Sequence, residues 1–199
     1  MEKNLLAIET RQAFRQWMEA HSEEETECWL PVRYGKPTGE GLYYLDAVEE
    51  ALCFGWIDSV KKPIDGKVYQ RFSPRREKGN WTELNKERVR RLEALGLMTE
   101  RGRRVLPPME EEFVFDEEIV RALKKHHLWT KFRSFPALYQ RVRASNIVFY
   151  KKRFPEEYPA MIARLVEETK RGRTYGEWDD YGRLTAYCAG VAPRNKKEE

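Results

Sequence analysis

A tight-turn dipeptide, Asp65-Gly66, constrains the fold of this chain more than any other feature of the sequence. It follows Pro63-Ile64 and separates two short runs, residues 57–62 and 67–72, that both carry β-branched or aromatic side chains. An Asp-Gly pair readily adopts the positive φ angles that a two-residue turn between antiparallel strands requires. The sequence therefore predicts an antiparallel hairpin over these residues.

The rest of the N-terminal half predicts helices around a small sheet. Apolar side chains at helical spacing favour helices over residues 7–20 and 45–53, and residues 28–34 favour a third strand. A further helix is expected to begin near Trp81, with Asn80 as its N-cap and Glu83 reaching back to it. Thr99 is expected to cap a short helix that ends before Pro107-Pro108.

The composition changes after Pro107-Pro108, where an acidic loop leads into sequence that is helical in pattern throughout. Helices are predicted over residues 116–126, 128–134, 136–153, 156–171 and 178–189. The expected fold class is therefore α+β: a small antiparallel sheet of about three strands packed with helices, followed by an all-helical C-terminal half. We expect an N-terminal α+β domain at residues 1–108, a helical domain at 109–190 and a flexible tail at 191–199.

The composition indicates a globular cytoplasmic protein. Hydrophobic residues make up 41% of the chain, which is enough for a substantial core. No stretch approaches the roughly 18 apolar residues of a membrane helix, so no membrane insertion is expected. The N-terminus lacks the basic and apolar regions of a secretory signal. Cys28, Cys53 and Cys188 are odd in number and widely spaced, which favours buried reduced thiols.

Positive charge is concentrated in one stretch of the chain, although the net charge is only +4. Residues 55–105 contain 14 Lys and Arg against 7 Asp and Glu, whereas the remaining residues are slightly acidic. Such an asymmetry favours a local anionic partner.

The second strand of the predicted hairpin offers the main candidate binding residues. If the even-numbered side chains from residue 68 to 72 pack inward, Tyr69 and Arg71 point outward together. Arg75 and Arg76 follow in a turn that leads to the next helix. Guanidinium groups beside the free N–H groups of a helix start can bind an oxyanion or a phosphate. Alternatively, these arginines pair with carboxylates of the same surface, such as those of Asp58 or Glu83.

Four further side chains are candidates for the same site. Trp56 and Asp58 flank the junction between the second helix and the hairpin, where they could supply an aromatic wall and a polar anchor. Equally, Trp56 could belong to the core and Asp58 could accept hydrogen bonds from the backbone of a turn. Trp81 and Asn85 lie one turn apart and would share a face of the next helix.

The sequence carries no recognisable catalytic or metal-binding motif. Gly-x-Ser-x-Gly, His-Glu-x-x-His and Cys-x-x-Cys are all missing. His126 and His127 are adjacent, so on a helix their side chains would point about 100° apart and could not easily share a metal ion. We therefore expect no catalytic residue, no metal and no cofactor.

Several blocks of sequence carry a family resemblance. The run Glu-Ala-Leu-Cys-Phe-Gly-Trp-Ile-Asp at residues 50–58 is distinctive, as is Gln-Arg-Phe-Ser-Pro-Arg-Arg at residues 70–76. Asn-Lys-Glu-Arg-Val at 85–89, Gly-Leu-Met-Thr at 96–99, Leu-Tyr-Gln-Arg-Val-Arg at 138–143 and Thr-Lys-Arg-Gly-Arg at 169–173 follow in order. Together they resemble the YdeI/OmpD-associated family, also called bacteriocin-protection proteins, over nearly the whole chain. The sequence departs from that pattern at Tyr43-Tyr44, where a Ser or Thr cap is expected.

The resemblance implies a role in stress or antimicrobial-peptide tolerance, without an agreed activity or cofactor. With the charge distribution, it favours a non-catalytic protein that binds an anionic small molecule or peptide through Arg71, Arg75 and Arg76. A nucleic-acid-binding protein is the first alternative, because Tyr69, Phe72 and Trp81 could stack on bases beside the basic residues, unless two of the three belong to the core. An enzyme of unrecognised class is the second.

Overall fold

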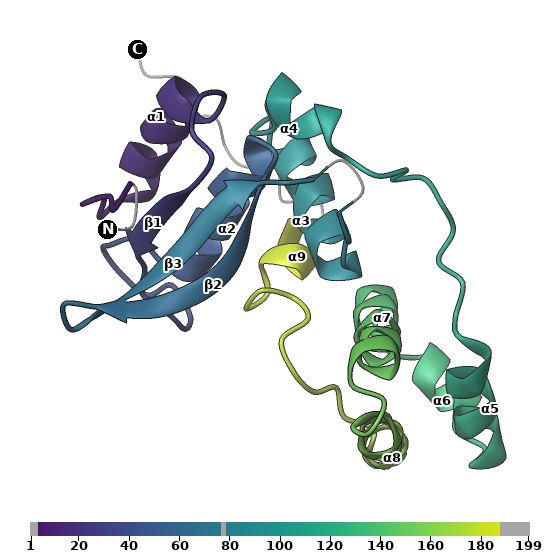
Figure 1. Cartoon of the computed structure of the whole chain (residues 1–199). Helices are drawn as coiled ribbons and strands as arrows, with labels where there is room; N and C mark the ends of the chain where they lie inside the picture. The colour runs from purple at the N-terminus through teal and green to yellow at the C-terminus, as the bar shows by residue number, and fades with distance from the viewer. Residues whose placement is uncertain (1–3, 77–78, 188–199) are drawn as a thin grey trace. The chain divides into compact units, whose positions relative to one another are not determined.

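The computed structural model describes residues 4–76 and 79–187 and confirms an α+β fold with a helical C-terminal half (Figure 1). Contacts divide the chain into two compact units. Unit 1 contains the described residues up to Asn80 together with Arg88–Pro107, and unit 2 contains Trp81–Glu87 together with the residues from Pro108 onward. The tail predicted at residues 191–199 and Cys188 lie outside the described residues.

Unit 1 contains an antiparallel sheet in the order β1-β3-β2, formed by β1 (Cys28–Pro31), β2 (Trp56–Ile64) and β3 (Lys67–Pro74). The predicted hairpin is confirmed: Ile64 pairs with Lys67, and the turn residues Asp65 and Gly66 have φ angles of 48° and 76°. The register shifts between Asp58 and Lys61 of β2, which marks a bulge.

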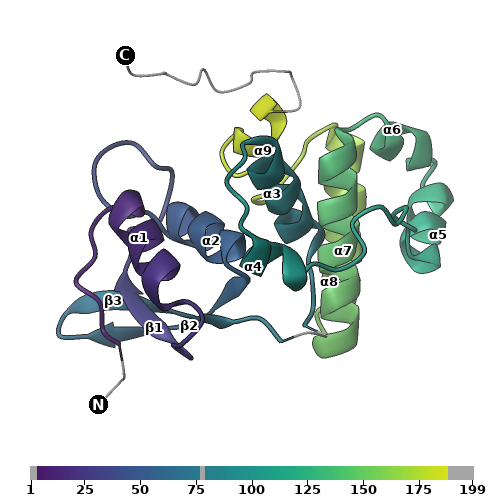
Figure 2. The same cartoon turned by 90° about the horizontal axis from the view of Figure 1, so that it is seen from above.

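The helices of unit 1 are α1 (Arg11–His21), α2 (Tyr44–Cys53), the part of α3 (Glu83–Ala94) from Arg88 onward, and α4 (Glu100–Arg104). Figure 2 shows α1 and α2 on the same side of the sheet. The ring of Phe14 in α1 lies 5.7 Å from that of Phe72 in β3. Cys28 and Cys53 are buried free thiols, as predicted. Thr99 caps α4 as predicted, because its hydroxyl accepts a hydrogen bond from the backbone N–H of Gly102.

Several sequence-based boundaries are wrong. α1 begins at Arg11 instead of residue 7, because the Thr10 hydroxyl accepts from the backbone N–H of Ala13 and caps the helix there. β1 ends at Pro31 instead of residue 34, since Arg33 forms a separate bridge with Tyr43. Tyr43 occupies the N-cap position of α2 without a side-chain cap.

The predicted start of the third helix is also wrong. α3 begins at Glu83, and its cap is Thr82, whose hydroxyl accepts from the backbone N–H of Asn85 at 3.2 Å. The Glu83 carboxylate does not reach back toward Asn80 but pairs with Lys86 and Arg141. Trp81 therefore precedes the helix and does not share a helix face with Asn85.

Unit 2 is helical and contains α5 (Glu117–Lys125), α6 (Trp129–Arg133), α7 (Ala137–Arg153), α8 (Tyr158–Arg171) and α9 (Arg183–Ala186). Buried apolar side chains from α5 to α8 form its main core, which includes Ile119, Leu123, Phe132, Tyr139, Ile147 and Leu165. Gly172 ends α8 with a φ of 72°, as predicted. α9 starts later than the predicted residue 178, because residues 180–182 all have positive φ angles, which a helix cannot accommodate.

None of the helices in the described ranges is long and apolar enough to cross a membrane.

Candidate ligand-binding site

The predicted binding residues have different surroundings in the structure. Arg71 of β3 is half-buried and engaged: its Nε atom donates to the Glu27 carboxylate at 2.6 Å, and a terminal nitrogen donates to the Ser59 hydroxyl at 3.3 Å. A ligand at Arg71 would have to compete with the carboxylate of Glu27.

Arg75 and Asp58 belong to a polar cluster of unit 1 that also includes Tyr44. The Arg75 side chain is buried and donates to the carbonyl of Asn80 at 3.2 Å. Burial lowers the pKa of Arg75 to about 10, and the negative charge of Asp58 opposes this effect. The Asp58 carboxylate accepts a hydrogen bond from the Tyr44 hydroxyl at 2.7 Å, so it bonds to a side chain of α2.

The remaining candidates differ in burial and in the unit to which they belong. Trp56 is a core residue, because it is 1% exposed and its indole N–H donates to the carbonyl of Ser22. Trp81 and Asn85 belong to unit 2. Arg76 is exposed.

The even-numbered side chains of β3 do not all face inward as predicted. Gln70 and Phe72 are buried, but Val68 near the hairpin tip is 44% exposed. The inward face of β3 is therefore shorter than the alternation suggests. Tyr69 and Arg71, on the opposite face, are partly exposed.

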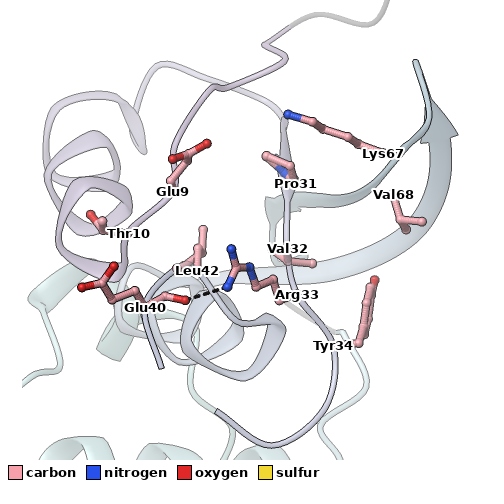
Figure 3. A pocket seen from close by; sticks show the side chains of 11 residues that line it. Glu9, Thr10, Pro31, Val32, Arg33, Tyr34, Glu40, Leu42, Lys67 and Val68 are labelled. Atoms are coloured by element: carbon pink, nitrogen blue, oxygen red, sulfur yellow. Dashed lines mark hydrogen bonds between the residues drawn. The ribbon is translucent and has the colours of Figure 1, made fainter. Parts of the chain in front are cut away.

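A cavity of about 840 Å³ lies in unit 1, beside the tip of the hairpin (Figure 3). Four segments contribute to its wall: the residues before α1, the end of β1 with the residues that follow it, the loop before α2, and the start of β3. It is lined by Glu9, Thr10, Pro31, Val32, Arg33, Tyr34, Glu40, Gly41, Leu42, Lys67 and Val68. Its volume falls in the range of roughly 300–1,000 Å³ that is typical of small-molecule sites.

Arg33 is the central cation of the cavity. Figure 3 shows its guanidinium between the α1 side, with Glu9 and Glu40, and the hairpin side, with Lys67. A terminal nitrogen of Arg33 donates to the backbone oxygen of Glu40 at 2.9 Å. A Cβ atom on Gly41 would lie 3.1 Å from the guanidinium carbon, so the glycine leaves room for this side chain.

Tyr34 provides an aromatic wall that several contacts hold in place. Its ring stacks on Tyr44 with centroids 5.2 Å apart, and the Lys61 ammonium lies 5.2 Å from the ring centroid. Its hydroxyl donates to the side chain of Gln70 at 2.9 Å. Burial raises the pKa of the Tyr34 phenol, and the charge of Asp58 adds to the effect. The cavity is thus connected through Tyr34 and Tyr44 to the polar cluster around Asp58.

The sequence did not indicate this cavity. In the sequence, Arg33 and Tyr34 only end the strand predicted at residues 28–34. One local signal existed: a cation and an aromatic residue stand directly before the loop at residues 35–41. The described residues contain no group of acidic, histidine or cysteine side chains placed to hold a metal ion.

Comparison with known families gives one match. A family described as a domain of unknown function, DUF8412, matches residues 6–105, which is half of the chain. The chain belongs to the DUF8412 family. The DUF8412 region includes every residue that lines the cavity and all three strands of the sheet. No curated protein and no solved structure matches the chain.

Proposed function

We propose that unit 1 is a non-catalytic binding domain for an anionic small molecule or peptide, and that the cavity around Arg33 is its site. The observation that supports the proposal is that two cations line the cavity without a carboxylate partner in the part of the chain that the structure describes. Within the described ranges, neither Arg33 nor Lys67 forms an ion pair, although both line an open cavity. Other arginines of the same unit are engaged by carboxylates, including Arg11, Arg15, Arg71, Arg91, Arg101 and Arg103.

A guanidinium and an ammonium that lack carboxylate partners can both bind an anion. Arg33 can donate two parallel hydrogen bonds to a carboxylate or a phosphate, and Lys67 adds a mobile point charge. Tyr34 also lines the cavity, where it adds an aromatic contact for an apolar part of the ligand. In this proposal the anion binds at the cavity around Arg33 and not at Arg71, Arg75 and Arg76. We further propose that the protein acts in the cytoplasm and has the stress-protective role that the resemblance to the YdeI/OmpD-associated family implies.

Binding of glutarate, measured by calorimetry at low salt, tests the proposal. We expect the full chain to bind this dicarboxylate, and Arg33→Gln to bind it at least about tenfold more weakly. The reason is that a hydrogen bond to a charged group contributes about 1.5–3 kcal/mol. Lys67→Gln should weaken binding less, since an ammonium is a single point charge whereas a guanidinium can donate two parallel hydrogen bonds. Lys36→Gln, an exposed lysine that does not line the cavity, is the matched control.

Two results would contradict the proposal. One is the absence of glutarate binding; the other is equal binding by the wild type and Arg33→Gln. A parallel Arg71→Gln variant distinguishes the cavity from the sequence-based site, because only the latter predicts weaker binding by Arg71→Gln. Strongly salt-dependent retention on heparin without any glutarate binding would favour the nucleic-acid alternative.

A further inference from the structure

We infer that the ligand of this cavity is dipolar: a short peptide or an amino-acid derivative that carries a cationic group as well as an anionic one. The inference rests on the proposed function, since it assigns the ligand class of the same site. The observation behind it is the presence of Glu9 and Glu40 in the wall that also contains Arg33 and Lys67.

Like the two cations, the two carboxylates have no ion-pair partner among the described residues. Glu9 precedes the N-cap of α1, and Glu40 lies in the loop before α2. Both are exposed, and neither forms an ion pair or a side-chain hydrogen bond within the part of the chain that the structure describes. The Arg33 guanidinium contacts the backbone carbonyl of Glu40 and not its carboxylate. All four charges therefore stay available to a ligand.

The arrangement of the four charges disfavours a ligand whose charged groups all have the same sign. The cavity contains two positive and two negative side chains, so its formal charge is zero. A purely anionic ligand held by Arg33 would bring its charge toward the carboxylates of Glu9 and Glu40, and like charges at close range repel. A ligand with a cationic group toward α1 and an anionic group toward Arg33 and Lys67 satisfies both sides (Figure 3).

The uncharged part of the wall favours a ligand with an apolar body. Val32 and Leu42 are buried side chains that line the cavity, and Val68 is 44% exposed there. Pro31 adds a further apolar surface. Charged groups of opposite sign around an apolar floor are the features that a zwitterionic peptide with an aliphatic side chain would use.

Two tripeptides of matched size test the inference. Lys-Leu-Glu carries a cationic end and an anionic end, whereas acetyl-Gln-Leu-Glu keeps the anionic end and the leucine without any cation. We expect the full chain to bind Lys-Leu-Glu about tenfold or more tightly than acetyl-Gln-Leu-Glu in calorimetry, because one added charge-assisted contact has this effect. In the Glu9→Gln/Glu40→Gln variant, the preference should fall to less than about threefold.

The controls separate this inference from the proposed function. Glu24→Gln removes an exposed carboxylate outside the cavity and should keep the full preference. Arg33→Gln should weaken the binding of both tripeptides and of glutarate. If glutarate and acetyl-Gln-Leu-Glu bind but Lys-Leu-Glu binds no better, the dipolar ligand is wrong and the anion site stands. If the preference survives in Glu9→Gln/Glu40→Gln, the inference is equally overturned. Failure of all three probes to bind the wild type would overturn both proposals.

Discussion

The two units of the protein differ in how they stabilise an arginine that is partly or fully buried. In unit 1, Arg11 of α1 bonds to three carboxylates of α2, those of Asp46, Glu49 and Glu50, at 3.3, 2.7 and 2.6 Å. In unit 2, Arg143 of α7 is 6% exposed and has no carboxylate within ion-pair distance among the described residues. Its guanidinium lies 4.3 Å from the ring centroid of Tyr175 and donates to the carbonyl of the same residue.

The network of unit 1 extends beyond Arg11. Glu49 is fully buried and also bonds to Arg91 at 2.8 Å, and Glu50 bonds to Arg15 at 2.9 Å. Burial alone would lower the pKa of Arg11, but the carboxylates of Glu49 and Glu50 outweigh burial and raise it above its ordinary value. Loss of Arg11 would therefore leave three carboxylates of one helix with one cationic partner fewer each.

The chemical nature of its partners determines how much free energy of unfolding is lost when a buried arginine is removed. Carboxylates that lose their arginine remain as buried charges, which are costly. Aromatic rings and a carbonyl that lose their arginine remain neutral, and each cation–π contact contributes only about 0.5–2 kcal/mol. Removal of the arginine should therefore destabilise unit 1 more than unit 2.

The largest effect is expected for Arg11→Met. We expect this variant to lose about 3 kcal/mol or more of unfolding free energy, because Glu49 and Glu50 stay buried with fewer cationic partners. Urea unfolding measures the loss, and hydrogen exchange should show it in the amides of α1 and α2. The exposed Arg104→Met is the control, with a change within about 0.5 kcal/mol. A loss below about 1 kcal/mol for Arg11→Met would contradict the comparison.

A smaller effect is expected for Arg143→Met. The variant loses a hydrogen bond from a charged group and the ring contacts, but it also removes the desolvation penalty of a buried guanidinium. The methionine sulfur can pack against the rings of Tyr139 and Tyr175. We expect a net loss of about 1–2 kcal/mol, located by hydrogen exchange in α7 and α8. The exposed Arg121→Met of α5 is the control. A loss as large as that of Arg11→Met would contradict the expected difference between the two units.

Local patterns explain which parts of the fold could be predicted from the sequence. Asp65-Gly66 fixes the hairpin turn through the backbone preferences of two adjacent residues, so neighbours in the chain suffice. The start of α3 was predicted wrongly because Asn80 and Thr82 are both good caps. The sequence alone does not show which of the two the tertiary structure selects.

The candidate site could not be predicted because its wall joins segments far apart in the chain. Glu9, Arg33, Glu40 and Lys67 follow no common spacing, and only the packing of the sheet and loops brings them together. The prediction for Arg71 met the same limit: its partner, Glu27, lies 44 residues earlier. The charge excess of residues 55–105 includes Lys67 but not Arg33, and it gives no information on which cations carboxylates engage.

The smallest change in unfolding free energy at neutral pH is expected for Tyr139→Phe. This variant keeps an aromatic ring beside Arg143 and removes only the hydroxyl. The Tyr139 hydroxyl is buried without a hydrogen-bond partner in the described residues, so its loss should change the stability by less than about 1 kcal/mol. At alkaline pH the variant should differ more from the wild type. Burial raises the pKa of Tyr139 to about 12, with Tyr175 adding to the effect and Arg143 opposing it.

The sign of this pH effect follows from linkage. Between about pH 10 and 12 the unfolded chain loses the Tyr139 proton while the folded chain keeps it, so the stability that this group contributes falls as the pH rises. Tyr139→Phe removes that contribution and should therefore lose stability less steeply than the wild type over the same range. Urea unfolding at several pH values from 9 to 12, the range set by the two pKa values, measures both slopes. Equal slopes would show that burial does not keep Tyr139 protonated in the folded protein, which would mean that water reaches the rings beside Arg143.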